Sequence, residues 1–151
     1  MYIGNSMKRK VISTTPTATV REAAKLLLTY HIGTLPVVDG ENKLIGLVRL
    51  RDLSNLAMPD FVKLLEQFDF VHDFGAVEEK PLDPATLDMP ISQIMTPPVS
   101  VEESTGLLRA AALLQNHQMS DLPVVDDDFH LVGIASYVDI GLALISHWDL
   151  K

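Results

Sequence analysis

Five histidines and a run of three aspartates are the residues of this 151-residue chain that first suggest metal chemistry. The histidines are His31, His72, His117, His130 and His147. None of them forms a His-x-x-x-His pair or a glutamate-flanked zinc motif. The aspartates at residues 126–128 lack the glycine and glutamate spacing of a calcium loop. We therefore predict no metal site and interpret the aspartates as a solvated turn.

Nucleophilic chemistry is also unsupported by the sequence. The chain has no cysteine, which excludes disulfides, thiolate zinc sites and cysteine nucleophiles. Its serines, histidines and aspartates show neither a nucleophile-elbow motif nor a Gly-rich phosphate loop of the NTPase type. We predict that this protein is not an enzyme.

The composition indicates which class of protein, globular, secreted or membrane-spanning, the chain belongs to. With 47% hydrophobic and 21% charged residues, the chain can bury a core of its own. The first ten residues are polar and basic, unlike a signal peptide, and the apolar residues 140–146 fall far short of the roughly 20 that cross a bilayer. We expect a cytoplasmic location without membrane insertion, either alone or as the cytoplasmic part of a larger protein.

Net charge is −8, and the basic cluster Lys8-Arg9-Lys10 is short. Because no aromatic residues accompany this cluster, we predict no nucleic-acid binding and interpret it as solvated charge. The alternative is that the basic first half steers a small anion toward itself.

The sequence contains an internal repeat, whose helices and strands would position the residues of a binding site. Leu-Pro-Val-Val-Asp at residues 35–39 recurs at residues 122–126, which is 87 positions later. Without a gap, residues 12–53 align with residues 99–140, and 13 of these 42 positions are identical. The chain therefore arose by internal duplication.

Each copy predicts the order β-α-β-β-α in a mixed α/β (α+β) fold. The first copy has an extended piece at 11–12, a helix after Thr17 or Thr19, strands at 35–38 and 44–48, and a helix from about Arg51. The second has the corresponding pieces at 99–101, 107–114, 122–125 and 131–136, and a helix from about Val138. Two such units bury their sheets by packing with pseudo-two-fold symmetry, which leaves two clefts at the seam.

The expected domain boundaries are residues 7–57 for repeat 1 and 94–148 for repeat 2. Between them, residues 58–93 are expected to form an inserted amphipathic helix at 60–68 and an exposed, acidic, Pro-containing loop at 75–90. The inserted helix either packs on its own module or docks a partner. His31 and His117 each end a predicted first helix, where a cation favours the helix dipole.

Residues 33–39 and 44–52, with the matching run 120–139, resemble the CBS-domain family. The resemblance implies a tandem CBS-domain pair (a Bateman module) in a stand-alone CBS domain-containing protein. It further implies a regulatory adenosyl-nucleotide sensor that catalyses nothing and requires no cofactor. AMP, ADP or ATP is the expected ligand, ahead of S-adenosylmethionine or NAD.

The family's ribose signature is Gly-apolar-apolar-Thr/Ser-x-x-Asp, which residues 133–139 match. By this resemblance Asp139 accepts hydrogen bonds from the ribose hydroxyls, Ser136 steadies the sugar or phosphate, and Gly133 keeps the strand close to the ligand. The alternative for Asp139 is a helix-capping role. The other residues that we assign to this site are Ile134, Ala135, Gly33, Thr34, Pro36, Arg51, Thr96 and Val99.

The first copy departs from this signature because Arg49 replaces the Thr or Ser. We therefore predict one competent site and one degenerate site, the latter containing Arg49, Asp52, Asp121 and Pro123. Arg49 is expected to fill that pocket by pairing with Asp52 or Asp121.

The resemblance also implies a homodimer formed through the helices, with the apolar residues 140–145 buried in it. Two alternatives remain. One is a pure dimerisation or assembly module without ligand, and the other is a regulatory subunit of a transporter or enzyme that acts in trans.

Overall fold

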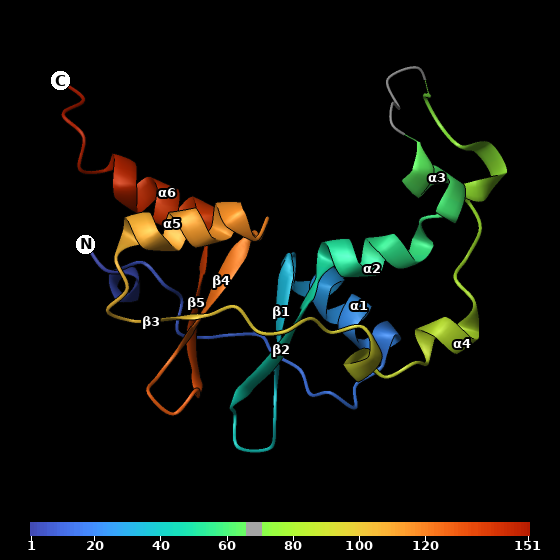
Figure 1. Ribbon diagram of the computed structural model, residues 1–151, viewed down its shortest axis with the longest axis horizontal. Coiled ribbons are helices and arrows are strands. Elements are labelled where there is room, and N and C mark those ends of the chain that lie inside the picture. The colour runs from blue at the N-terminus through green and yellow to red at the C-terminus, as the bar shows by residue number, and fades with distance from the viewer. Residues whose placement is uncertain (66–70) are drawn as a thin grey trace.

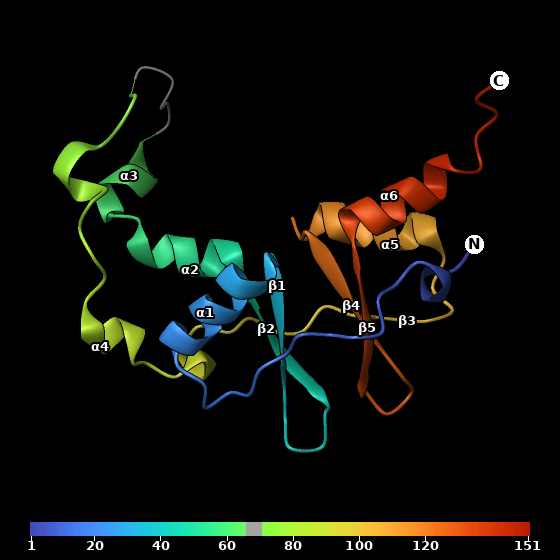
Figure 2. The ribbon, with the colours of Figure 1, turned by 180° about the vertical axis from the view of Figure 1, so that it is seen from behind.

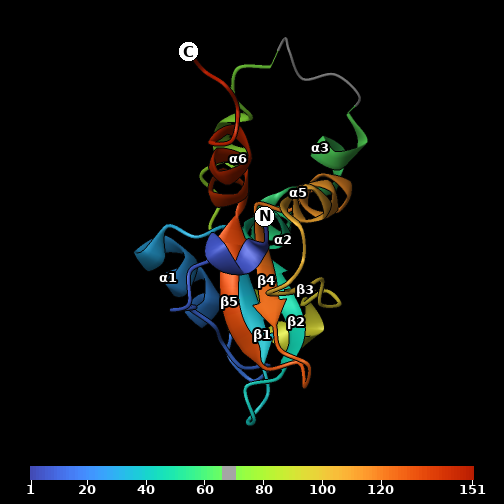
Figure 3. The same ribbon diagram turned by 90° about the vertical axis from the view of Figure 1, so that its left-hand side faces the viewer.

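Two β-hairpins, one from each copy of the repeat, form the frame of the protein. The computed structural model describes residues 1–65 and 71–151. Strands β1 (Thr34–Val38) and β2 (Leu44–Arg49) pair antiparallel, as do β4 (Asp121–Val125) and β5 (Leu131–Ser136). Viewed along the long axis, β4 and β5 lie in front of β1 and β2 (Figure 3). The predicted duplication is thus a duplication of structure.

Each hairpin is joined to two helices. These are α1 (Val20–Tyr30) and α2 (Leu50–Ala57) in the first repeat, and α5 (Leu107–Asn116) and α6 (Tyr137–Ile145) in the second. Thr19 and Glu22 form a capping box at the start of α1. His31 and His117 are the C-caps of α1 and α5. Both helix pairs lie on one side of the molecule and the hairpin turns lie on the other (Figure 1).

An extended segment at the start of each copy pairs in parallel with its own hairpin. In the second copy this segment is β3 (Val101–Glu102), where Val101 pairs with Val124. In the first copy the pairing is a single parallel bridge between Thr14 and Val37, one repeat length earlier; the predicted piece at 11–12 itself forms no strand. The order β-α-β-β-α is therefore present twice.

The segment that precedes each repeat crosses to the other repeat. Near the N-terminus, the 3₁₀ helix η1 (Ile3–Asn5) is followed by Lys8, whose amide nitrogen lies 2.8 Å from the oxygen of Ile134. Symmetrically, η3 (Ile91–Gln93) is followed by Thr96, whose amide nitrogen lies 2.9 Å from the oxygen of Leu47. Figure 2 shows both segments crossing the hairpins between the helices and the hairpin turns. This exchange ties the two repeats together.

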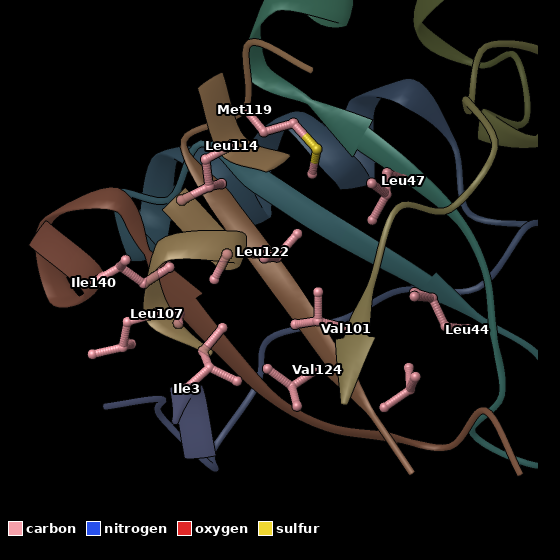
Figure 4. Close-up of a cluster of buried hydrophobic side chains, with 13 residues drawn as sticks. Ile3, Leu44, Leu47, Val101, Leu107, Leu114, Met119, Leu122, Val124 and Ile140 are labelled. Atoms are coloured by element: carbon pink, nitrogen blue, oxygen red, sulfur yellow. The ribbon is translucent and has the colours of Figure 1, made fainter. Parts of the chain in front are cut away.

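The hydrophobic core of each repeat also contains a residue from the crossing segment. Ile3 is fully buried in the core of the second repeat, and Ile91 is fully buried in that of the first. Leu44 and Leu47 of β2 also contribute to the second core, across the seam (Figure 4). Neither repeat therefore has a complete core without residues from the other half of the chain. The boundaries predicted from the sequence, 7–57 and 94–148, stay predictions.

Besides η3, the described residues of the insertion between the repeats form the short helical pieces α3 (Asp60–Leu64), η2 (Gly75–Val77) and α4 (Pro84–Leu87). The expected helix at 60–68 is confirmed only as far as Leu64, and its residues 66–68 lie outside the described part of the chain. The prediction of a loop throughout 75–90 was wrong at α4. Asp83 caps this helix through the amide of Ala85, and Pro84 stands in its first turn, where a missing N–H costs nothing.

The acidic run 126–128 forms a turn between β4 and β5. One carboxylate oxygen of Asp126 accepts the amides of Asp128 at 3.0 Å and His130 at 2.8 Å. Partial burial raises the pKa of Asp126, but these hydrogen bonds outweigh it, so the net shift is downward. Among residues 1–65 and 71–151, no three His, Asp or Glu side chains gather as a metal site, and no helix has the length and hydropathy of a membrane span.

Gly133 is required by the crossing N-terminal segment. A Cβ atom at this position would lie 2.5 Å from the sulfur of Met7 and 3.1 Å from the carbonyl oxygen of Lys8. We expect Gly133→Ala to lower the free energy of unfolding by about 1–3 kcal/mol, because the segment must move away. Gly141→Ala in α6 is the control: it meets nothing within 4 Å and is expected to stabilise by about 0.5–1 kcal/mol. Equal effects of the two substitutions in urea unfolding would refute this explanation.

Candidate functional site

A narrow cleft lies at the seam between the two repeats, in front of the start of α6. Its volume is about 100 Å³. Its walls come from the crossing N-terminal segment, from the starts of β1 and β4, and from the end of β5. The lining residues are Lys8, Lys10, Val11, Ile12, Ile32, Thr34, Asp121, Ile134, Ser136 and Asp139.

Ser136 and Asp139 hold each other in this cleft. The hydroxyl oxygen of Ser136 accepts the amide of Asp139 at 3.0 Å, and Oδ2 of Asp139 accepts the amide of Ser136 at 3.1 Å. This capping box starts α6 and fixes the carboxylate in one position. The side chain of Asp139 is 25% exposed, and Nζ of Lys8 lies 4.0 Å from its Oδ2. A helix cap and a solvent-accessible carboxylate are therefore combined in one residue.

Thr34 lines both this cleft and a second, larger space of about 380 Å³. The larger space lies at the N-terminus of α2 and is lined by Gly33, Thr34, Arg49, Leu50, Arg51, Ser54, Gln118 and Ser120. The guanidinium of Arg51 donates to the side chain of Gln118 at 2.9 Å. Two arginines, three hydroxyl groups and a helix N-terminus give this space the chemistry of an anion site.

The two strands that begin at the pseudo-two-fold axis approach each other closely. A Cβ atom on Gly33 would lie 2.5 Å from Oγ of Ser120, so only glycine permits this approach. Oγ of Ser120 lies 2.7 Å from Oδ2 of Asp121, to which it donates, and 3.4 Å from the hydroxyl of Thr34. Because of this contact, Thr34 and Asp121 both reach the cleft of Asp139.

The pseudo-symmetric position is filled by the protein's own side chains. The guanidinium of Arg49 donates to both carboxylate oxygens of Asp52 at 3.2 Å, and the amide of Arg49 donates to Oδ2 at 2.8 Å. The predicted Arg49–Asp52 pair is therefore present. Met119, which corresponds to Ile32 of the open cleft, is buried and points toward Leu47 (Figure 4).

The structure brings several of the residues that we assigned to the competent site together. Thr34, Ile134, Ser136 and Asp139 line the cleft, and Gly33 and Arg51 line the adjoining space. Others face elsewhere: Ala135 is buried in the second core, and Pro36 is buried within the first hairpin, as Pro123 of the predicted degenerate site is within the second. Gly133 is covered by Met7 and Lys8 rather than left open to a ligand.

Three residues do not lie at the site, competent or degenerate, to which the sequence analysis assigned them. Thr96 pairs with Leu47 of β2, beside Arg49 rather than beside Ser136. Val99 packs against the second core, and its equivalent Ile12 is the residue that lines the open cleft. Asp121 was assigned to the degenerate site but lines the cleft of Asp139. The crossing of the preceding segments explains the first two, and the close contact at the axis explains Asp121.

Lys8 and Lys10 were missed, because the basic cluster was interpreted as solvated charge. A signal for them exists in the sequence. Ile3 and Met7 recur as Ile91 and Met95, 88 positions later rather than 87. This extension of the repeat makes Lys8 the equivalent of Thr96. The equivalence was missed because the offset here is 88 rather than 87 residues.

Comparison with known proteins identifies the repeated unit. The sequence model of the CBS domain matches residues 3–58 and 91–146. The chain is 39% identical over 126 residues to the chloroplastic CBS domain-containing protein CBSX1 of Arabidopsis thaliana, which covers 79% of this chain and 52% of that protein. It is 30% identical over 144 residues to a homoserine O-acetyltransferase of Methanocorpusculum labreanum, covering 95% of this chain and 24% of that protein.

Among solved structures, CBSX2 in complex with AMP matches with a TM-score of 0.71 and 29% identity, over 96% of each chain. The two curated relatives are longer than the region they share. The chain spans about half the length of CBSX1 and about a quarter of the acetyltransferase.

Proposed function

Because the chain belongs to the CBS-domain family, we propose that it is a regulatory module that binds one adenosine-containing ligand per chain. The binding site is the cleft of Ser136 and Asp139, and the module performs no chemistry on the ligand. The observation that carries this proposal is the contrast between the two pseudo-symmetric positions. One presents a fixed, accessible carboxylate, whereas the other is occupied by the Arg49–Asp52 pair and Met119.

The geometry supports a ligand with a sugar and a charged tail. A carboxylate such as that of Asp139 accepts hydrogen bonds from two vicinal ribose hydroxyls. Beyond Thr34, the space next to Arg51 suits an acidic group. The two neighbouring spaces together fall within the about 300–1,000 Å³ of small-molecule sites. The solved complex of CBSX2 with AMP supports an adenine nucleotide as one candidate.

Regulation follows from the position of the cleft. A ligand there contacts the N-terminal segment, β1 and α6, which belong to different halves of the chain. If the ligand prefers one arrangement of the two repeats, its binding shifts the population toward that arrangement. A homodimer through the helix faces, a cytoplasmic location and a regulated enzyme or transporter belong to the same proposal.

The test is a thermal-shift titration with AMP, ADP, ATP, S-adenosylmethionine and NAD, each with and without magnesium. A melting temperature that rises with ligand concentration, as linkage requires, supports the proposal. If no compound shifts the melting temperature while the protein stays dimeric in sedimentation, the alternative of an assembly module is correct.

Restoring the second site is a further prediction. Arg49→Ser together with Met119→Ile reproduces the pair Ser136 and Ile32 of the open cleft and releases Asp52. We expect calorimetry to show the stoichiometry rise from one to two ligands per chain. Arg9→Ser, on an exposed pair with Glu103, is the control and leaves the stoichiometry at one. A double variant that folds and still binds a single ligand would contradict this prediction.

A further inference from the structure

Asp121 is a second carboxylate in the candidate cleft. It starts β4 and lines the same space as Asp139. Its hydrogen-bond partner is the hydroxyl of Ser120, which lies 2.7 Å from its Oδ2. Within the part of the chain that the structure describes, Asp139 has Lys8 at 4.0 Å, whereas none of the ion pairs involves Asp121. The negative charge of Asp121 is therefore paired only with a neutral hydroxyl.

Asp121 lies on the side of the cleft that faces the space next to Arg51. Thr34 lines both the cleft and that adjoining space, so the two spaces are neighbours. Oδ2 of Asp121 lies 3.6 Å from a Cβ built on Gly33, the residue before Thr34. A ligand whose ribose is held by Asp139 therefore occupies a cleft that Asp121 also lines, on the side of Gly33 and Thr34.

We infer that Asp121 is a specificity residue, which favours an adenosyl ligand with a positive charge beside the ribose over one with phosphate there. The inference rests on the proposed function, because it assumes that Asp139 holds the ribose. A positive group next to the ribose is attracted by the unpaired carboxylate, and a phosphate at the same place is repelled. A negative group further along the tail is suited by Arg51, whose guanidinium donates a hydrogen bond to the neutral side chain of Gln118.

Two probes isolate this charge. S-adenosylmethionine and S-adenosylhomocysteine differ by one methyl group and by the positive charge on sulfur beside the ribose. We expect the wild-type protein to bind the sulfonium compound about fivefold more tightly, which is the size expected of one partly screened charge pair. Asp121→Asn is expected to bring this ratio to about one and to tighten AMP binding by a similar factor, measured by calorimetry at low salt.

Two further variants make the test decisive. Asp121→Thr copies Thr34 at the pseudo-symmetric position and provides a second folded variant with the same expected ratios. Asp127→Asn removes an exposed charge from the β4–β5 turn, outside the cleft, and is expected to leave all ratios as in the wild type. Circular dichroism verifies that each variant is folded.

The outcomes separate the two proposals. If neither these compounds nor any ligand of the thermal-shift titration binds the wild-type protein, the proposed function itself is wrong. If they bind, and the folded Asp121 variants keep the wild-type ratio of sulfonium to thioether and the wild-type affinity for AMP, Asp121 does not determine specificity.

Discussion

Asp139→Asn is expected to weaken adenosyl-ligand binding by about a hundredfold. The substitution keeps an oxygen that accepts the amide of Ser136, so the start of α6 is preserved. It removes the charge that would strengthen two hydrogen bonds from ribose hydroxyls. Hydrogen bonds to a charged group contribute about 1.5–3 kcal/mol each, and 1.4 kcal/mol corresponds to a tenfold change in affinity. Isothermal titration calorimetry measures the loss directly.

Asp52→Asn provides the matched control in the other repeat. Asp52 occupies the same position relative to α2, where it caps the helix amide of Arg49 and pairs with its guanidinium. Its side chain is 14% exposed, and Arg49 already occupies both of its oxygens. We expect unchanged ligand affinity. Equal losses in the two variants would mean that both positions bind ligand, and no loss in either would place the site elsewhere.

Ile3→Ala is expected to lower the free energy of unfolding by about 2–4 kcal/mol, although Ile3 is only the third residue of the sequence. Ile3 is fully buried in the core of the second repeat, and its amide donates to the oxygen of Thr105 at 2.9 Å. Truncation leaves a cavity between η1 and α5, whose Leu107 belongs to the same core. Urea unfolding with circular dichroism gives the free-energy difference.

Hydrogen exchange shows which repeat Ile3→Ala destabilises. Because the N-terminal segment crosses the molecule, Ile3→Ala should accelerate hydrogen exchange first in β4 and β5 rather than in the neighbouring first repeat. Ile91→Ala is the matched variant, since Ile91 is fully buried in the first core, and it should accelerate exchange in β1 and β2. Tyr2→Ala, at a side chain that is 57% exposed, is expected to change stability by less than about 0.5 kcal/mol. If hydrogen exchange accelerated equally in both repeats, the conclusion that each preceding segment packs on the opposite repeat would be wrong.

The sequence predicted the repeated architecture because local signals were consistent with one another in both copies. Apolar periodicity and Thr19 predicted α1, and alternating turns and apolar runs predicted all four strands of the hairpins. The spacing of Ser136 and Asp139 predicted their proximity, because residues at the N-cap and third positions of a helix meet through the backbone geometry alone. The sequence left Asp52 and Asp121 as alternative partners of Arg49, and the structure pairs Arg49 with Asp52.

Contacts between the two halves depended on the tertiary structure. The crossing of residues 2–8 and 90–96 carries Lys8 into the cleft and Thr96 away from it, and no local pattern specifies which sheet a lone extended segment joins. The position of Asp121 beside Asp139 follows from the close approach of Gly33 and Ser120, a contact between residues 87 positions apart. Local hydrogen bonding and periodicity are properties of short segments, so the sequence alone determined the repeats and their helix caps. Which residues face each other across the seam is decided by long-range packing, and it is there that the walls of the candidate site and its charge are formed.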